Sequence, residues 1–94
     1  MGEKHTMMST DISVRIRDFI TNEFLFGDAS GLLRDDASLV DHGVMDSIRV
    51  VSLLMFIEEE FRFGVPDEDV VPEYLDSVDN LTAYIQSRLE APRD

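Results

Sequence analysis

Residues 41–48 read Asp-His-Gly-Val-Met-Asp-Ser-Ile, and they end a polar, glycine-containing loop where an apolar-periodic run from Ile48 to Phe61 begins. This order predicts a helix that starts at Asp46 or Ser47. The Ser47 hydroxyl then lies at an exposed helix N-terminus, where unpaired backbone N–H groups and the helix dipole favour an anion such as a phosphodiester. By position alone, an ordinary N-cap is the commoner role for either residue.

The sequence that follows extends this pattern. The apolar run ends Ile-Glu-Glu-Glu-Phe at residues 57–61, and Val-Pro-Asp-Glu follows at residues 65–68. With Asp46-Ser47-Ile48 in this register, the chain from about Asp11 to Leu89 resembles the acyl carrier protein family, whose signature is Asp-Ser-Leu, -Ile or -Met at the start of its second helix. The resemblance implies that Ser47 carries a 4'-phosphopantetheine arm, which a separate phosphopantetheinyl transferase moves from coenzyme A. It also implies that Asp46 helps the transferase to engage Ser47.

Length and composition describe one small acidic domain. We assign residues 10–90 of the 94 to a carrier domain, residues 1–9 to a flexible N-terminal tail and residues 91–94 to a C-terminal tail. The net charge of −12, from 20 acidic and 8 basic residues, disfavours nucleic acid and anionic membrane surfaces and favours partners with basic patches. Because the chain has no cysteine, thioester chemistry would require a thiol on a prosthetic group.

The sequence lacks a membrane span and a secretion signal. No apolar run approaches the roughly 20 residues that a spanning helix needs, and the N-terminus lacks the apolar stretch of a signal peptide. We therefore expect a cytoplasmic protein, and we expect it to be a monomer.

The first helix is predicted from Ser9–Asp11 to about Phe26, with Gly27 as its stop. Its apolar stripe has helical spacing and consists of Ile12, Ile16, Phe19 and Ile20. A long loop follows up to Asp46, with a short helical turn expected near Gly31–Arg34. A loop of this length needs apolar side chains to hold it against the bundle; the candidates are Leu32, Leu33, Leu39, Val40 and Val44.

The second helix, from Ser47 to about Arg62, is predicted to have two apolar faces. The core face consists of Val50, Leu53, Leu54, Ile57 and Phe61, and the opposite face of Ile48, Val51 and Met55, with Ser52 and Glu59 beside them. The second face is either buried beneath the long loop and the short third segment or exposed as a docking strip for partner enzymes. In the acyl carrier protein family this helix face is the usual docking surface, which assigns docking to Ile48, Arg49, Val51, Met55 and Glu59. Arg49 departs from the family, since many members carry an acidic residue there; a basic residue would weaken attraction to a basic partner and change which partners bind.

Two shorter predictions complete the fold. Asp67-Glu68-Asp69 after Pro66 begins a short helix, which Pro72 limits to a turn or two. Asp76 or Ser77 caps a final helix with Tyr84 beside its apolar stripe, which consists of Val78, Leu81, Ile85 and Leu89. The fold class is thus all-α: a small up-down bundle with three main helices, one short helix and a long first loop, like an acyl carrier protein.

Rival chemistries fit the residues poorly. A hydrolase built on Ser47 and His42 lacks a Gly-x-Ser-x-Gly elbow, so His42 is better explained as a loop residue with local hydrogen bonds. A calcium loop over Asp35–Asp46 has apolar residues where oxygen ligands are needed. The clusters Glu58–Glu60 and Asp67–Asp69 are interpreted as solvated faces, with weak divalent-cation binding as the alternative.

The sequence therefore predicts a carrier that is not itself an enzyme. An acyl or aminoacyl group would be held as a thioester on the phosphopantetheine arm of Ser47 and presented to loading and synthase enzymes of fatty acid, polyketide or related biosynthesis. The alternative is an unmodified helical interaction module that uses the apolar strip of the second helix.

Overall fold

Three long helices form the bundle. The structure is a computed structural model that describes residues 9–25 and 34–90. Its elements are α1 (Ser9–Phe24), α2 (Ser47–Phe61), the 3-10 helix η2 (Asp67–Asp69), α3 (Pro72–Leu75) and α4 (Val78–Glu90). The described residues contain no strand, and the all-α prediction of three main helices with a short one is confirmed.

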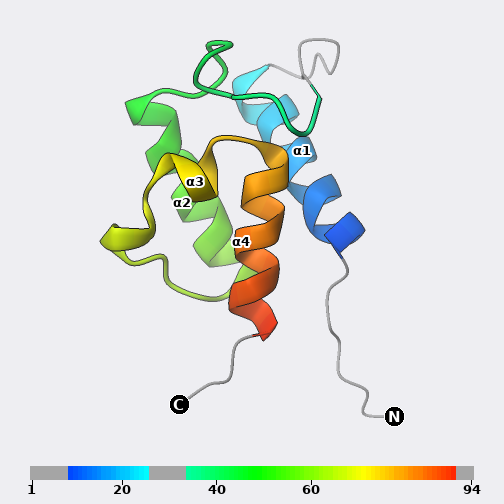
Figure 1. Ribbon diagram of the computed structural model, residues 1–94, viewed down its shortest axis with the longest axis vertical. Helices are drawn as coiled ribbons and strands as arrows, with labels where there is room; N and C mark the ends of the chain where they lie inside the picture. The colour runs from blue at the N-terminus through cyan, green and yellow to red at the C-terminus, as the bar shows by residue number, and fades with distance from the viewer. Residues whose placement is uncertain (1–8, 26–33, 91–94) are drawn as a thin grey trace.

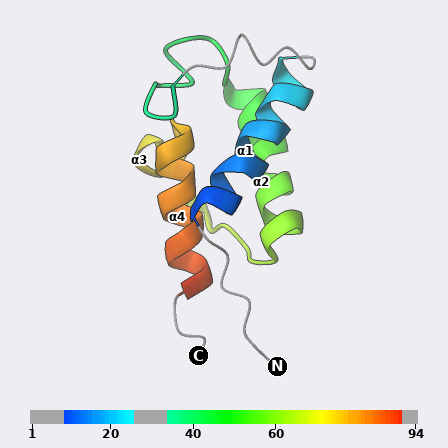
Figure 2. The same cartoon turned by 90° about the vertical axis from the view of Figure 1, so that its right-hand side faces the viewer.

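Two of the three long helices run in the same direction, and the first runs in the opposite direction (Figure 1). α1 runs antiparallel to both α2 and α4, which run in the same sense (Figure 1). Turning the molecule shows α1 lying across the side that α2 and α4 share (Figure 2). The chain that leaves α2 must therefore return along the bundle before α4 begins, and η2 and α3 lie on this return.

The core is built from the predicted helical stripes. Each long helix contributes residues spaced three or four apart, so one face of each helix is removed from water and stabilises the bundle. The buried residues of the helices are Ile12, Ile16, Ile20, Phe24, Leu53, Ile57, Phe61, Leu75, Val78, Leu81, Tyr84 and Ile85. Phe19 stacks on Phe56 of α2 with ring centroids 4.3 Å apart, which adds an aromatic contact between α1 and α2. In the described part of the chain, no helix has the length and apolar character needed to span a membrane.

The loop before α2 is held in the core by fewer residues than predicted. Leu39 and Val44 are buried as expected, and Met45 is buried with them. The prediction for Val40 is wrong, because this residue is 56% exposed. Its N–H donates a hydrogen bond to the Asp76 carboxylate at the α3–α4 junction, and its side chain lies at the rim of a pocket. The predictions for Phe26, Gly27, Leu32, Leu33, the helical turn from Gly31 and the tails over residues 1–8 and 91–94 lie outside the described residues. Ser9, which was assigned to the N-terminal tail, is instead the first residue of α1.

The third region differs from the prediction at Pro72. This proline does not end the short helix; it occupies the first turn of α3, where a missing N–H costs nothing because that N–H has no partner inside a helix. The acidic triplet after Pro66 forms the single short turn η2, within the predicted limit of a turn or two, and it is a 3-10 helix that ends before Pro72. At the end of α4, Leu89 is 38% exposed, because the last turn extends beyond the other helices' cover.

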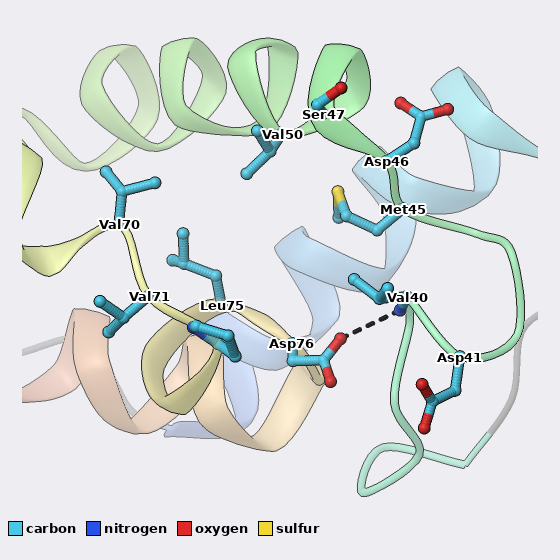
Figure 3. Close-up of a pocket in the computed structure, with 11 residues that line it drawn as sticks. Val40, Asp41, Met45, Asp46, Ser47, Val50, Val70, Val71, Leu75 and Asp76 are labelled. Atoms are coloured by element: carbon cyan, nitrogen blue, oxygen red, sulfur yellow. Dashed lines mark hydrogen bonds between the residues drawn. The ribbon is translucent and has the colours of Figure 1, made fainter.

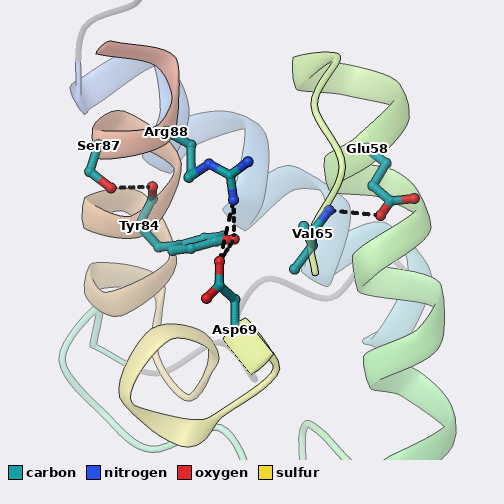
Figure 4. Close-up of polar contacts among 6 residues, drawn as sticks. All are labelled: Glu58, Val65, Asp69, Tyr84, Ser87 and Arg88. Atoms are coloured by element: carbon teal, nitrogen blue, oxygen red, sulfur yellow. Dashed lines mark hydrogen bonds and ion pairs between the residues drawn. The ribbon is translucent and has the colours of Figure 1, made fainter. Parts of the chain in front are cut away.

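A polar latch fastens η2 to α4. The Tyr84 hydroxyl donates a hydrogen bond of 2.7 Å to the Asp69 carboxylate, and Arg88 donates to both the Tyr84 oxygen (3.0 Å) and Asp69 (3.3 Å) (Figure 4). On the other side of this return segment, the Glu58 carboxylate accepts a hydrogen bond from the Val65 N–H. The segment between α2 and α4 is thus tied to both helices.

Candidate functional site

Asp46 and Ser47 have different positions at the start of α2. Asp46 is the N-cap: its backbone is extended and one carboxylate oxygen accepts hydrogen bonds from the N–H groups of Ile48 (3.0 Å) and Arg49 (2.8 Å). Ser47 is therefore the first helical residue and is not needed as the cap.

The Ser47 side chain is exposed to solvent. Among the described residues it has no hydrogen-bond partner, although Asp46 beside it has two. Its position at the N-terminal end of a helix of 15 residues is electrostatically suited to a covalently attached phosphate, because the unpaired N–H groups of the first turn carry partial positive charge. The serine that the sequence analysis identified is thus exposed to solvent at the start of α2.

A pocket of about 470 Å³ lies beside this serine, between the first turn of α2, the end of the loop and the α3 region. Val50 and Met45 point from the α2 side toward Val70 and Leu75, while the Ser47 hydroxyl lies at the rim and points away from the space (Figure 3). The walls are mostly apolar, and carboxylates occur at the rim; the lining residues are Val40, Asp41, Met45, Asp46, Ser47, Val50, Val70, Val71, Pro72, Leu75 and Asp76.

Asp76 joins the loop wall of this pocket to the α3–α4 junction. Its carboxylate accepts hydrogen bonds from the Val40 N–H (3.0 Å) and the Ser38 hydroxyl (2.6 Å), and its backbone carbonyl accepts one from the Leu39 N–H (2.7 Å). The sequence predicted only a helix cap at this position. Ser77 is the residue that caps α4, since its hydroxyl accepts the Asn80 N–H at 2.9 Å.

The second apolar face of α2 is exposed. The exposed fractions of Ile48, Val51 and Met55 are 78%, 55% and 57%, and Ser52 and Glu59 are exposed beside them. The alternative in which this face is buried beneath the loop is therefore wrong for the described residues. The strip of Ile48, Val51 and Met55 begins one residue after Ser47, so a protein bound there would lie close to the serine.

Arg49 is the docking candidate that differs from the others. It is half-buried, and its guanidinium donates to the Val44 carbonyl at 2.9 Å and lies 5.3 Å from the centroid of the Phe24 ring. Its side chain is thus turned toward the loop and α1, while Ile48, Val51, Met55 and Glu59 face solvent.

The residues of the rival chemistries have other contacts. The His42 ring nitrogen Nδ1 lies 2.9 Å from the Ser38 carbonyl oxygen, as expected for a local loop contact. Within residues 9–25 and 34–90, no group of three or more His, Cys, Asp or Glu side chains is arranged to hold a metal ion. In the acidic clusters, Glu60 pairs with Arg15 and Asp69 pairs with Arg88.

Comparison with known proteins finds a phosphopantetheine-attachment family and several carrier proteins. The family described as "Phosphopantetheine attachment site" matches residues 25–85. The chain is similar to the acyl carrier protein of Bdellovibrio bacteriovorus, with 31% identity over 80 residues that cover 85% of this chain and 97% of the relative. It is also similar to the acyl carrier protein of Akkermansia muciniphila, with 34% identity over 80 residues, 85% of this chain and 95% of the relative. Aminoacyl carrier protein 1 of Bradyrhizobium diazoefficiens is 28% identical over 82 residues, which cover 87% of this chain and 90% of that protein.

Proposed function

The chain belongs to the acyl carrier protein family, and on this premise we propose that Ser47 is the residue to which the 4'-phosphopantetheine arm is attached. The observation that carries the proposal is the Ser47 hydroxyl in the first turn of α2, which is exposed and has no hydrogen-bond partner among the described residues. Asp46 caps the helix in its place, so attachment of the arm would sacrifice no hydrogen bond of the fold.

The attachment is a phosphoryl transfer from coenzyme A. A bond would form between Ser47 Oγ and the phosphorus next to the pantetheine, and the bond from that phosphorus to the adenosine bisphosphate part would break. The hydroxyl proton would pass to a base of the transferase, because the Ser47 hydroxyl has no hydrogen-bonded base among the described residues. Asp46 supports this step by holding the first turn of α2 in place.

The arm supplies the thiol that the chain lacks, and this thiol holds the cargo as a thioester. The protein itself catalyses no step; it presents the cargo to other enzymes. The pocket of about 470 Å³ beside Ser47 supports partial sheltering of an acyl or aminoacyl group, because its mostly apolar walls would remove such a group from water. The site suits the arm because Ser47, the proposed point of attachment, is exposed at the rim of the pocket.

The exposed strip on α2 is the proposed docking surface. Ile48, Val51 and Met55 supply apolar contact area, and Glu59 beside them supplies a negative charge for a basic patch on the partner. The partners are the phosphopantetheinyl transferase and the loading and synthase enzymes of fatty acid, polyketide or related biosynthesis. Arg49, at the edge of the strip, lowers the negative charge next to Ser47 and so restricts the range of partners.

The decisive experiment measures the intact mass of the apo protein after incubation with coenzyme A and a broad-specificity phosphopantetheinyl transferase. We expect the wild-type protein to gain one phosphopantetheine unit and Ser47→Ala to gain none. Ser52→Ala is the matched control, because Ser52 is also an exposed serine of α2 but lies more than a turn further on; it should be modified like the wild type. A wild-type protein that stays unmodified, when the transferase modifies a control carrier, would favour the unmodified interaction module.

A further inference from the structure

Arg49 connects three parts of the molecule around Ser47. From the first turn of α2, its guanidinium donates a hydrogen bond of 2.9 Å to the carbonyl oxygen of Val44 in the loop. The same group lies over the ring of Phe24, the last residue of α1, at 5.3 Å from the centroid. One side chain therefore contacts the end of the loop and the end of α1 from a position two residues after the serine.

The carbonyl that Arg49 binds belongs to a tightly held turn. The N–H groups of Val44 and Met45 both donate to the Leu39 carbonyl, at 2.9 and 3.1 Å, and both side chains are buried. Asp46 follows directly and binds the Arg49 N–H through its carboxylate. Arg49 thus grips the segment from Val44 to Asp46 at both ends, by its side chain at one end and by its backbone at the other.

A guanidinium suits this position better than any other cation. It donates several N–H bonds in one plane and can stack on an aromatic face at the same time, whereas an ammonium group is a compact point charge that cannot do both in the same way. A hydrogen bond from a charged donor is also stronger than one between neutral groups. The contacts of Arg49 therefore depend on the shape of the group as well as on its charge.

We propose that Arg49 is a positioning residue for the modification of Ser47: its guanidinium sets the angle at which the Val44–Asp46 segment presents the serine to the transferase. The proposal rests on Ser47 being the attachment site. It differs from a purely electrostatic effect of Arg49 on docking, because an electrostatic effect needs only a positive charge.

The test compares Arg49→Lys and Arg49→Gln with the wild type, in the apo form and at a temperature where circular dichroism shows every variant to be folded. Arg34→Gln is the matched control, because it removes the same charge from a side chain that is 84% exposed in a surface pair with Asp36. Two quantities are measured: the amide hydrogen exchange of Val44 and Met45, and kcat/KM for transfer of phosphopantetheine from coenzyme A.

We expect both Arg49 variants to exchange the Val44 and Met45 amides faster than the wild type and to lower kcat/KM by about tenfold, since small misplacements of a reacting group are costly. In Arg49→Lys, which keeps the positive charge beside the strip of Ile48, Val51 and Met55, the loss should fall mainly on kcat. Arg34→Gln should alter neither quantity. If Arg49→Gln does not fold, Arg49→Lys carries the test, because it keeps the charge.

Three results would overturn the proposal. Wild-type behaviour of Arg49→Lys would show that charge alone matters, and unchanged transfer despite faster loop exchange would show a structural role only. A loss equal to that of Arg34→Gln would assign the effect to net charge. Failure of the attachment-site assignment is recognised separately, because the wild-type protein would then accept no arm before any variant is compared.

Discussion

At the residue scale, the start of α2 places a carboxylate that caps the helix next to an exposed serine hydroxyl. Asp46 satisfies two N–H groups that would otherwise lack partners, and Ser47 remains exposed. Had the helix begun one residue later, Ser47 would have been the cap and its oxygen would have been occupied by a backbone N–H. Availability of the serine thus depends on the residue before it.

Asp46→Ala should lower the free energy of unfolding by about 1 kcal/mol, the usual cost of losing an N-cap. Asp46→Asn should lower it much less, because an asparagine oxygen can accept the same bonds. Urea denaturation measures both values. Since Asn keeps the cap but loses the charge, slower modification of Asp46→Asn with unchanged stability would support a direct role in engaging the transferase. Equal stability of Asp46→Ala and the wild type would contradict the capping role.

Tyr84 is the residue whose ionisation the fold perturbs most clearly. Burial, followed by the hydrogen bond to Asp69 and the charge of that carboxylate, raises the pKa of Tyr84 from 10.0 to about 12. Because the pKa is higher in the folded than in the unfolded protein, the stabilisation is fully present below pH 10 and is lost as the pH rises toward 12.

The chain has two tyrosines, so the Tyr74→Phe variant keeps only Tyr84. Spectrophotometric titration of this variant should therefore show ionisation of Tyr84 with a midpoint near pH 12 in the folded protein. The unfolding midpoint in urea should fall over the same alkaline range. Tyr84→Phe is the control and should not show this part of the fall. A midpoint near the ordinary tyrosine value would mean that the latch of Tyr84, Asp69 and Arg88 does not persist in solution.

At the element scale, α2 carries two apolar faces that differ in burial. Leu53, Ile57 and Phe61 are buried against the other helices, and the opposite strip is exposed next to the serine. A surface helix needs only one apolar stripe to hold it in a bundle. The second strip therefore contributes little to folding and is available for a partner.

Met55→Glu should change the free energy of unfolding by no more than about 0.5 kcal/mol, as is usual for an exposed position. Leu53→Ala, on the buried face of the same helix, should cost about 2–5 kcal/mol. In the transfer reaction the order should reverse: Met55→Glu should lower kcat/KM, whereas folded Leu53→Ala should be modified at nearly the wild-type rate. Unfolding of Met55→Glu would show that the strip packs into the core and would refute the docking surface.

At the scale of the whole molecule, the net charge of −12 opposes the compact state. Local pairs offset part of this repulsion, including Arg15–Glu60 between α1 and α2 and Arg17–Asp35 between α1 and the loop. The remaining carboxylates repel one another over distances that salt can screen.

Raising NaCl from about 0.01 to about 0.15 M, which shortens the screening length from about 30 to about 8 Å, should raise the melting temperature. A gain of 1 kcal/mol corresponds to about 4–8 °C in a domain of this size. MgCl2 at equal ionic strength should add nothing further, since the described residues hold no group of three or more metal-ligating side chains. A larger effect of Mg²⁺ than of matched NaCl would support divalent-cation binding at the acidic clusters.

The sequence alone determined the features that depend on neighbours within a turn or two. The stripe of Ile12, Ile16 and Ile20, the two faces of α2 and the exposed Asp46–Ser47 start are all consequences of helical periodicity and capping, which are local. The inward contacts of Leu39 and Val44 were also predicted, because a long loop must bury some apolar residues.

Only the tertiary structure decided the features that join distant residues. The pocket beside Ser47 needs Val40, Val50 and Leu75 in one place, and Asp76 reaches the loop across more than thirty residues of chain. Arg49 is the clearest case: a long, flexible side chain can extend into solvent or fold back, and the choice depends on whether a free carbonyl and an aromatic ring lie within reach. Those partners come from the loop and from α1, so no local pattern could have predicted them.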